Sequence, residues 1–265
     1  MSFDNKHINK TIISDCRGQI PVLQFDSLTI HPNISHGVFT RKGGVSRPPY
    51  DSLNVSYNTG DLHERVACNL NLIKERIGAR RIMCMHQVHG TGIFSYHKDN
   101  YIDTAATVPT ADAIITDVPL LGVMVKQADC QGVIIYDPLT SVVSVVHCGW
   151  RGNVRNILGA AVKRMGDEFG CHAEDLKAAI GPSLGPCCAE FKTYGDIFPE
   201  EFMRYRVRED HFNLWDISRM QLMRSGLAEE NIEIAGICTK CNTDLFFSYR
   251  AEGDTGRFGT VAMIK

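Results

Sequence analysis

Apolar residues along the chain recur with two periods, one typical of strands and one typical of helices. Short runs rich in Val, Ile and Leu indicate strands buried on both faces of a sheet. Such runs occur near residues 81–88, 112–117, 121–127, 132–137, 142–147, 178–180, 232–237 and 260–264, and residues 11–40 alternate apolar and polar groups as short antiparallel strands do.

The clearest helical pattern covers residues 61–78. Asp61 is a plausible N-cap, and Gly78 would end the helix because glycine adopts the left-handed conformation without a Cβ penalty. The apolar residues that define the pattern are three or four positions apart: Val66, Leu70, Ile73 and Ile77.

Two further helices are expected, at residues 153–169 and 216–226. We expect Asp216 or Ser218 to cap the second of these, and Gly226 to end it.

The order of these elements indicates the fold class. Strands outnumber helices and do not alternate regularly with them, which favours an α+β fold over a doubly wound α/β fold. The sequence has no internal repeat, linker or low-complexity segment. We therefore expect residues 1–265 to form a single domain of packed mixed β-sheets flanked by helices.

Composition limits the classes of binding partner. Hydrophobic residues make up 44% of the 265 positions and the net charge is −2, so no strong field favours nucleic acid or an anionic membrane. No apolar run approaches the roughly 18 residues of a membrane helix, and the polar N-terminus lacks a signal-peptide pattern. We expect a cytoplasmic monomer.

Most of the ten cysteines should then be reduced. We interpret the adjacent Cys187 and Cys188 as free thiols. Cys238 and Cys241 form a lone CxxC, which is a weak zinc signal without a second pair and more often reflects two separate thiols.

Three expected strands end in side chains that can bind metals: His89, Cys130 and His147. Two imidazoles and one thiolate suit zinc, and a three-ligand site keeps a fourth position open for chemistry. The three residues are far apart in the sequence, so the alternative is a buried cysteine and two independent histidines.

The same residues could instead form a cysteine hydrolase, with Cys130 as the nucleophile and His147 as its base. Asp129 is a poor orienting group for this pair, because neighbours on an extended strand point to opposite faces. A third possibility is a non-catalytic binding module, in which His89 would be dispensable.

Two arginines close to glycine, Arg41 and Arg151, could bind phosphate through the planar guanidinium group. Structural salt bridges are the alternative. Arg250 and Arg257, which lie near Gly253 and Gly256, have the same two interpretations.

Together these segments resemble the YfiH-like laccase-domain family, whose bacterial members are also labelled polyphenol oxidase or peptidoglycan-editing factor. The resemblance runs through nearly the whole chain. The matching segments are, in order, residues 39–46 (FTRKGGVS), 50–54 (YDSLN), 60–61 (GD), 87–90 (QVHG), 111–113 (ADA), 128–130 (ADC), 147–152 (HCGWRG), 180–182 (IGP), 246–250 (FFSYR) and 255–257 (TGR).

The resemblance implies an α+β domain with a Zn²⁺ site formed by His89, Cys130 and His147. It also implies a purine nucleoside phosphorylase that uses adenosine, inosine, guanosine and methylthioadenosine, with adenosine deaminase activity. The alternative is a cysteine-type amide hydrolase, such as a peptidoglycan-precursor editing enzyme.

For phosphorolysis we expect Arg41 or Arg151 to hold phosphate and Asp112 to protonate the departing base, with Asn54 also at the substrate site. Two departures from the family pattern bear on the shape of the pocket. This chain has Gln131-Gly132 where the family has a proline near position 132. It has Cys188-Ala189 where the family often has an aromatic residue.

The laccase label implies a copper cluster supplied by many histidines, usually in His-x-His pairs. None of the ten histidines forms such a pair. A site of two histidines and one cysteine instead suits group transfer or hydrolysis.

Overall fold

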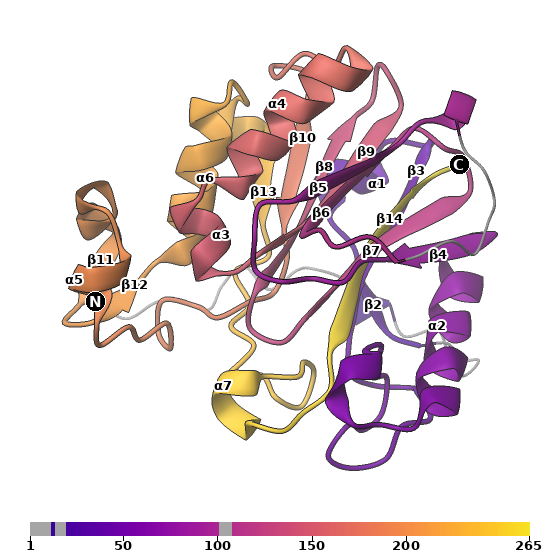
Figure 1. Ribbon diagram of the computed structural model, residues 1–265, viewed down its shortest axis with the longest axis horizontal. Coiled ribbons are helices and arrows are strands. Elements are labelled where there is room, and N and C mark those ends of the chain that lie inside the picture. Colours follow the sequence, from indigo (N-terminus) through magenta and orange to yellow (C-terminus); the bar gives the residue numbers. More distant parts are fainter. Residues whose placement is uncertain (1–11, 14–19, 101–107) are drawn as a thin grey trace.

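Two six-stranded sheets pack face to face, and helices cover their outer faces, in a computed structural model that describes residues 12–13, 20–100 and 108–265 (Figure 1). The first sheet has the order β1 (Ile12–Ile13), β2 (Val22–Leu23), β3 (Ile34–Phe39), β14 (Phe258–Ile264), β7 (Leu121–Gln127) and β4 (Arg81–Cys84). The second has the order β13 (Ile232–Ile234), β10 (Lys177–Ile180), β8 (Gln131–Asp137), β9 (Val142–Cys148), β6 (Ala113–Thr116) and β5 (Ile93–Tyr96).

Both sheets are mixed, since β4 pairs with β7, β5 with β6, and β10 with β13 in parallel, while the other neighbours are antiparallel. The helices are α1 (Asp26–Thr29), α2 (His63–Ile77), α3 (Trp150–Val154), α4 (Ile157–Phe169), α5 (Tyr194–Ile197), α6 (Leu214–Arg224) and α7 (Tyr249–Glu252). The remaining elements are 3₁₀ turns at Tyr57–Thr59, Lys98–Asn100, Glu200–Tyr205 and Glu229–Asn231, and the hairpin of β11 (Arg206–Arg208) and β12 (His211–Phe212). The expected α+β fold of mixed sheets flanked by helices is confirmed.

Burial explains the layers. The main core lies between the sheets, where Val125 of β7 and Phe258 of β14 pack in one cluster with Ile134 of β8 and Val145 of β9. A second cluster lies under α2 on the outer face of the first sheet, and a third lies under α4 and α6 on the second. Strands buried on both faces need apolar residues at every position, and the continuous runs in the sequence provide them. Among the described residues, no helix has both the length and the hydrophobicity of a membrane span.

The two sheets are in close contact where β8 begins. A Cβ on Gly132 would lie 2.4 Å from Thr260 Oγ1 and 2.6 Å from Gln127 Nε2. These two groups belong to the opposite sheet, and Gln127 Nε2 donates a hydrogen bond to Thr260 Oγ1. Only glycine fits at this position, which gives a physical reason for Gly132 in the segment that departs from the family pattern.

Three helix boundaries differ from expectation. Helix α6 begins at Leu214, because the Asn213 side chain caps it by accepting a hydrogen bond from the Asp216 amide, so the expected caps were wrong. The helix expected at 153–169 is broken into α3 and α4 at Asn156, which has φ 53° and caps α4 through the Gly159 amide. Helix α2 starts after Leu62, but it ends at Gly78 as expected.

Replacing Gly132 with alanine should lower the free energy of unfolding by about 1–3 kcal/mol, because the added methyl group overfills the contact between the sheets. Urea unfolding followed by circular dichroism measures the change. Gly195→Ala in α5 is the matched control, since nothing lies within 4 Å of the position that its methyl group would take and its φ is not left-handed. Equal destabilisation of the two variants would contradict the close packing at β8.

Candidate functional site

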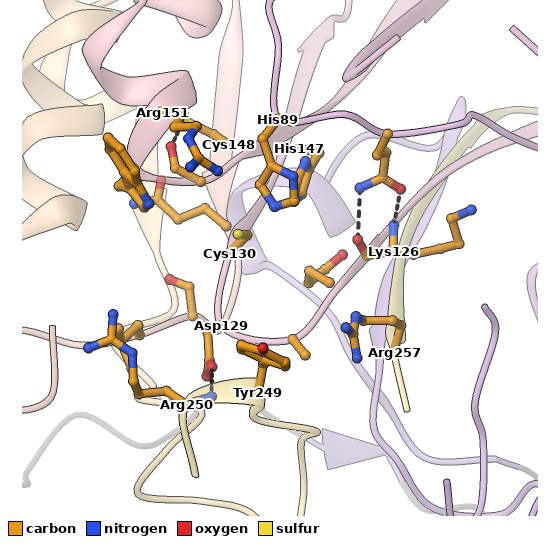
Figure 2. Close-up of a pocket in the computed structure, with 18 of the residues that line it drawn as sticks. His89, Lys126, Asp129, Cys130, His147, Cys148, Arg151, Tyr249, Arg250 and Arg257 are labelled. Carbon is orange, nitrogen blue, oxygen red and sulfur yellow. Dashed lines mark hydrogen bonds between the residues drawn. The ribbon is translucent and has the colours of Figure 1, made fainter. Parts of the chain in front are cut away.

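Three of the predicted residues converge on one point at the end of the second sheet. His89 lies in the loop after β4, Cys130 in the turn between β7 and β8, and His147 near the end of β9. Their ligand atoms all lie within 4.8 Å of one another, and the two imidazole rings meet edge to face with centroids 4.9 Å apart (Figure 2). We call this group the His–Cys–His centre.

A buried carboxylate fixes both histidines. Asp112 Oδ1 lies 2.9 Å from His147 Nδ1 and accepts the His89 amide at 3.0 Å, while Oδ2 accepts the amides of Val88 and Gly90 at 3.2 and 2.7 Å. A carboxylate only accepts, so Nδ1 of His147 carries the proton and Nε2 is available as a ligand. The hydrogen bonds from these three amides also stabilise the left-handed backbone of His89, whose φ is 58°.

Glycine permits the close approach of the three side chains. A Cβ on Gly149 would lie 2.8 Å from Cys130 Sγ and 3.4 Å from His89 Cδ2. The glycine that follows His147-Cys148 therefore leaves room for the sulfur and the ring beside it.

Electrostatics favour a charged pair in the metal-free centre. Burial opposes the Cys130 thiolate, but the charges and hydrogen bonds of His147 and His89 lower the thiol pKa to about 6. Burial likewise opposes protonated His147, but Cys130 and Asp112 raise its pKa to about 9. The metal-free protein thus holds a thiolate beside an imidazolium at neutral pH.

The donor set fits zinc. Two imidazoles and a thiolate match a three-ligand zinc site, and a carboxylate bound to the second nitrogen of a ligating histidine is the usual supporting contact. His89, Cys130 and His147 would hold the ion, and Asp112 would orient His147.

A cavity of about 600 Å³ opens above the centre. Four cationic residues line this central pocket: Lys126, whose ammonium donates to the Met85 carbonyl at 3.1 Å, and Arg151, Arg250 and Arg257. None of them forms an ion pair with a described carboxylate. Asp129, the one acid among the lining residues, already accepts hydrogen bonds from Thr239 Oγ1, Ser248 Oγ and the Arg250 amide. The pocket therefore presents positive charge that a bound anion could neutralise.

Of the expected substrate residues, Arg151 lines the central pocket, but Arg41 does not. Arg41 donates to Glu252 Oε1 at 2.8 Å, to the Thr243 carbonyl at 2.7 Å and to the Asp51 carbonyl at 2.9 Å, and its guanidinium stacks on Phe247. This geometry corrects the expected phosphate role: Arg41 is a structural residue that ties together the loops beside the pocket.

Asn54 also lies outside the central pocket and is fully buried. Its Oδ1 accepts the amides of Ser56 and Arg257 at 3.1 and 2.9 Å. The expectation that Asn54 contacts substrate is corrected in the same way, since the side chain supports two residues that line the pocket.

The surroundings of Asp112 do not suit its expected role as a general acid. It is fully buried, and four donors surround its oxygens. Burial alone would raise its pKa, but the hydrogen bonds from His147 and the Gly90 and Val88 amides lower it below the usual value. An ionised, saturated carboxylate cannot give a proton to a leaving base, so Asp112 positions His147.

Lys126 is a pocket residue that the sequence alone did not single out, whereas Arg257 was one of four arginines with two open interpretations. Lys126 lies within a continuous apolar strand, and no glycine or motif marks it. Arg257 and Arg41 both have a glycine close by in the sequence, and that signal did not separate a pocket arginine from a structural one.

Comparison with known proteins gives consistent matches. Residues 35–265 match the family described as multi-copper polyphenol oxidoreductase laccase. A purine nucleoside phosphorylase from Bacteroides thetaiotaomicron is 32% identical over 262 residues, which cover 92% of this chain and 96% of the relative. The purine nucleoside phosphorylase YlmD from Geobacillus stearothermophilus is 31% identical over 240 residues, which cover 83% of this chain and 86% of the relative.

Two solved structures share the fold. The crystal structure of YlmD from Geobacillus stearothermophilus has a TM-score of 0.83 at 27% identity and covers 97% of this chain and 99% of its own. That of the hypothetical protein YfiH from Bacillus licheniformis has a TM-score of 0.83 at 26% identity, with 92% and 96% covered. The family description names copper, whereas the metal-capable groups among the described residues are the His–Cys–His centre and a group of four cysteines. By sequence and by structure, the chain belongs to this laccase-like family of YfiH and YlmD proteins.

Proposed function

We propose that the protein is a zinc-dependent purine nucleoside phosphorylase with adenosine deaminase activity, acting on adenosine, inosine, guanosine and methylthioadenosine. The observation that carries the proposal is the set of cations around the His–Cys–His centre, none of which pairs with a described carboxylate. Phosphorolysis needs an anionic co-substrate next to a nucleoside, and the names of the relatives point to the same reaction.

Phosphate is the natural partner of these cations. Arg257 is half-buried, and its side chain donates only to the Thr255 and Gly256 carbonyls among the described groups, at 2.8 and 2.9 Å. Burial lowers its pKa from the usual value even though Cys130 and Asp129 oppose the shift. An anion bound there would offset the cost of burying this charge, and we assign Arg257 to the phosphate, with Arg151 as a further cation of the same pocket.

The nucleoside fits the remaining space. A cavity of about 600 Å³ is within the usual range for small-molecule sites. Tyr249 lies 61% exposed at the rim and offers a flat face for a purine or ribose. A phosphate held by the cations would attack the anomeric carbon of the ribose, and the purine would leave.

A zinc ion held by the His–Cys–His centre would supply Lewis acidity at the floor of the pocket. The protein contributes the orientation of that centre. Asp112 holds the proton on His147 Nδ1, so Nε2 is the nitrogen that would give up its proton and bind the metal.

A second candidate is a cysteine-type amide hydrolase, for example a peptidoglycan-precursor editing enzyme. The low thiol pKa of Cys130 beside protonated His147 favours it, because a thiolate–imidazolium pair is the resting state of such enzymes. The two proposals make opposite demands on metal, since zinc bound to Cys130 would block its attack on an amide.

Purified protein incubated with adenosine should release adenine only when phosphate is present, and should form inosine with or without phosphate. Chromatography of adenine, inosine and hypoxanthine measures both reactions. A chelator should abolish them and added zinc should restore them. Formation of none of these products would end the nucleoside proposal, and activity that survives complete metal removal would end the zinc requirement.

Replacing Arg257 with glutamine should raise the KM for phosphate about 10–100-fold, because a charge-assisted hydrogen bond contributes about 1.5–3 kcal/mol. The KM for the nucleoside should change little. Arg155→Gln is the matched control: Arg155 is exposed at the end of α3 and does not line the central pocket. An unchanged KM for phosphate would contradict the assigned role of Arg257.

Alkylation of Cys130 in the metal-free protein should follow its lowered pKa. The thiolate is the reactive form, so the rate should already be near its plateau at pH 7 and fall with a midpoint near pH 6 as acid protonates the sulfur. Mass spectrometry of the iodoacetamide-labelled peptide gives the rate. Bound zinc should protect Cys130, and His147→Ala should move the midpoint toward that of an ordinary thiol. A midpoint near 9 in the unchanged protein would contradict the charged pair.

A further inference from the structure

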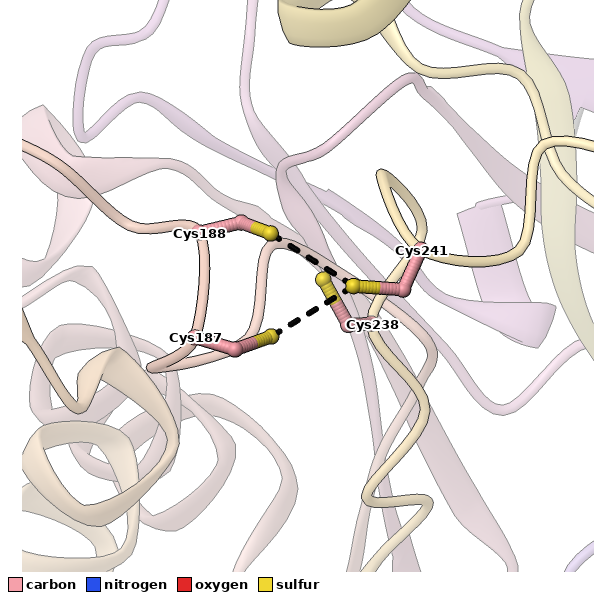
Figure 3. A group of neighbouring side chains, drawn as sticks. All are labelled: Cys187, Cys188, Cys238 and Cys241. Carbon is pink, nitrogen blue, oxygen red and sulfur yellow. Dashed lines mark hydrogen bonds between the residues drawn. The ribbon is translucent and has the colours of Figure 1, made fainter.

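A second group of sulfur ligands lies outside the central pocket. Cys187 and Cys188 lie in the turn after Gly185-Pro186, and Cys238 and Cys241 lie in the loop after β13. All four sulfur atoms lie within 4.8 Å of one another, and Figure 3 shows them directed toward a common point. We call these residues the four-cysteine cluster, and we propose that it is a structural zinc site separate from the His–Cys–His centre.

The spacing of the sulfurs fits one ion. Cys241 Sγ lies 3.6 Å from Cys187 Sγ and 3.5 Å from Cys188 Sγ. Four thiolates around zinc at about 2.3 Å form a tetrahedron with edges of about 3.8 Å, close to these distances. A disulfide needs about 2.05 Å, and all four cysteines are free. A polynuclear iron–sulfur cluster places several irons and sulfides between its cysteines and needs a wider cage.

Packing does not account for the cluster. Cys187 and Cys241 are exposed, so burial of apolar surface does not explain why they gather with Cys188 and Cys238. The buried member, Cys238, accepts the Gly185 amide at 3.3 Å, which is the type of contact that stabilises a metal-bound thiolate. Arg208 donates to the Cys187 carbonyl at 2.9 Å and brings a positive charge to a site that would carry net negative charge.

The backbone around the cluster is already ordered for this role. Ser183 pairs with Cys238 in an isolated parallel bridge, and the Thr239 amide donates to the Ser183 carbonyl at 3.0 Å. Asn242 Nδ2 donates to the Cys238 carbonyl at 2.8 Å and closes the turn between the two cysteines of the CxxC. The two loops are thus held side by side, and the ion would join them with bonds stronger than these.

The site would also stiffen one wall of the central pocket. Thr239, next to Cys238, donates to Asp129 at 2.7 Å, and the Leu184 amide donates to the Asp129 carbonyl at 2.8 Å. Asp129 precedes Cys130 of the His–Cys–His centre. Zinc at the four-cysteine cluster would therefore fix the loops that position this turn without taking part in the reaction.

The test is the zinc content of the full chain, measured by elemental analysis after purification without chelator. The double variant Cys187→Ser/Cys241→Ser should hold one zinc fewer per chain than the unchanged protein. Both positions are exposed, so the substitutions leave the core intact, which thermal unfolding verifies. Cys68→Ser, an exposed cysteine on α2, is the matched control and should lose none.

His89→Ala separates this proposal from the proposed function. This variant disables the His–Cys–His centre but should keep the zinc of the four-cysteine cluster. Cobalt loaded into metal-free His89→Ala protein should show the strong thiolate-to-cobalt absorption of a tetrahedral four-sulfur site, and this measurement stands even where the double variant fails to fold. Equal zinc content in the double variant and the unchanged protein, iron in place of zinc, or disulfides among the four residues would overturn the proposal.

Discussion

The buried carboxylate of Asp112 is the contact on which the site depends. It joins a loop of the first half of the chain to the last residues of β9, because it accepts three successive amides from 88–90 and the imidazole of His147. The same charge holds His89 in a left-handed conformation and sets the tautomer of His147. Loss of this charge would leave the amides and the ring without partners in a buried place, a cost far larger than the hydrogen bonds themselves contribute.

Close packing of the sheets brings the ends of the strands into register. Gly132 lets β8 lie against β14, and Gly149 leaves room for the Cys130 sulfur. Antiparallel pairing places Gly132 opposite His147, so Cys130, in the turn just before β8, lies beside the end of β9. The site therefore needs small residues in the scaffold as much as it needs the ligands, since a methyl group at either glycine would displace a neighbouring atom.

Short-range patterns in the sequence predicted the features that depend on neighbouring residues. Continuous apolar runs marked the buried strands, and the reactive residue after each run marked the His–Cys–His centre. The break of the long helix at Asn156 was not predicted, because an asparagine in a helical pattern does not reveal that its backbone is left-handed. Arg41 and Arg257 both lie within two residues of a glycine, and only the fold shows that the first is paired with Glu252 while the second lines the pocket.

The same limit explains why the sequence did not predict the four-cysteine cluster. Each half is an unremarkable pair in the sequence, and the halves are about fifty residues apart, so only the pairing of Ser183 with Cys238 reveals their proximity. The pocket wall near them is built from loops without a strand ladder, and its hydrogen bonds run largely through side chains such as Asp129 and Thr239. Such bonds contribute about 1 kcal/mol each and open easily on their own. A wall of this kind needs a stronger cross-link if it is to hold an arginine-rich pocket in one shape, and among the described residues beside it the four converging sulfurs are the group that can provide one.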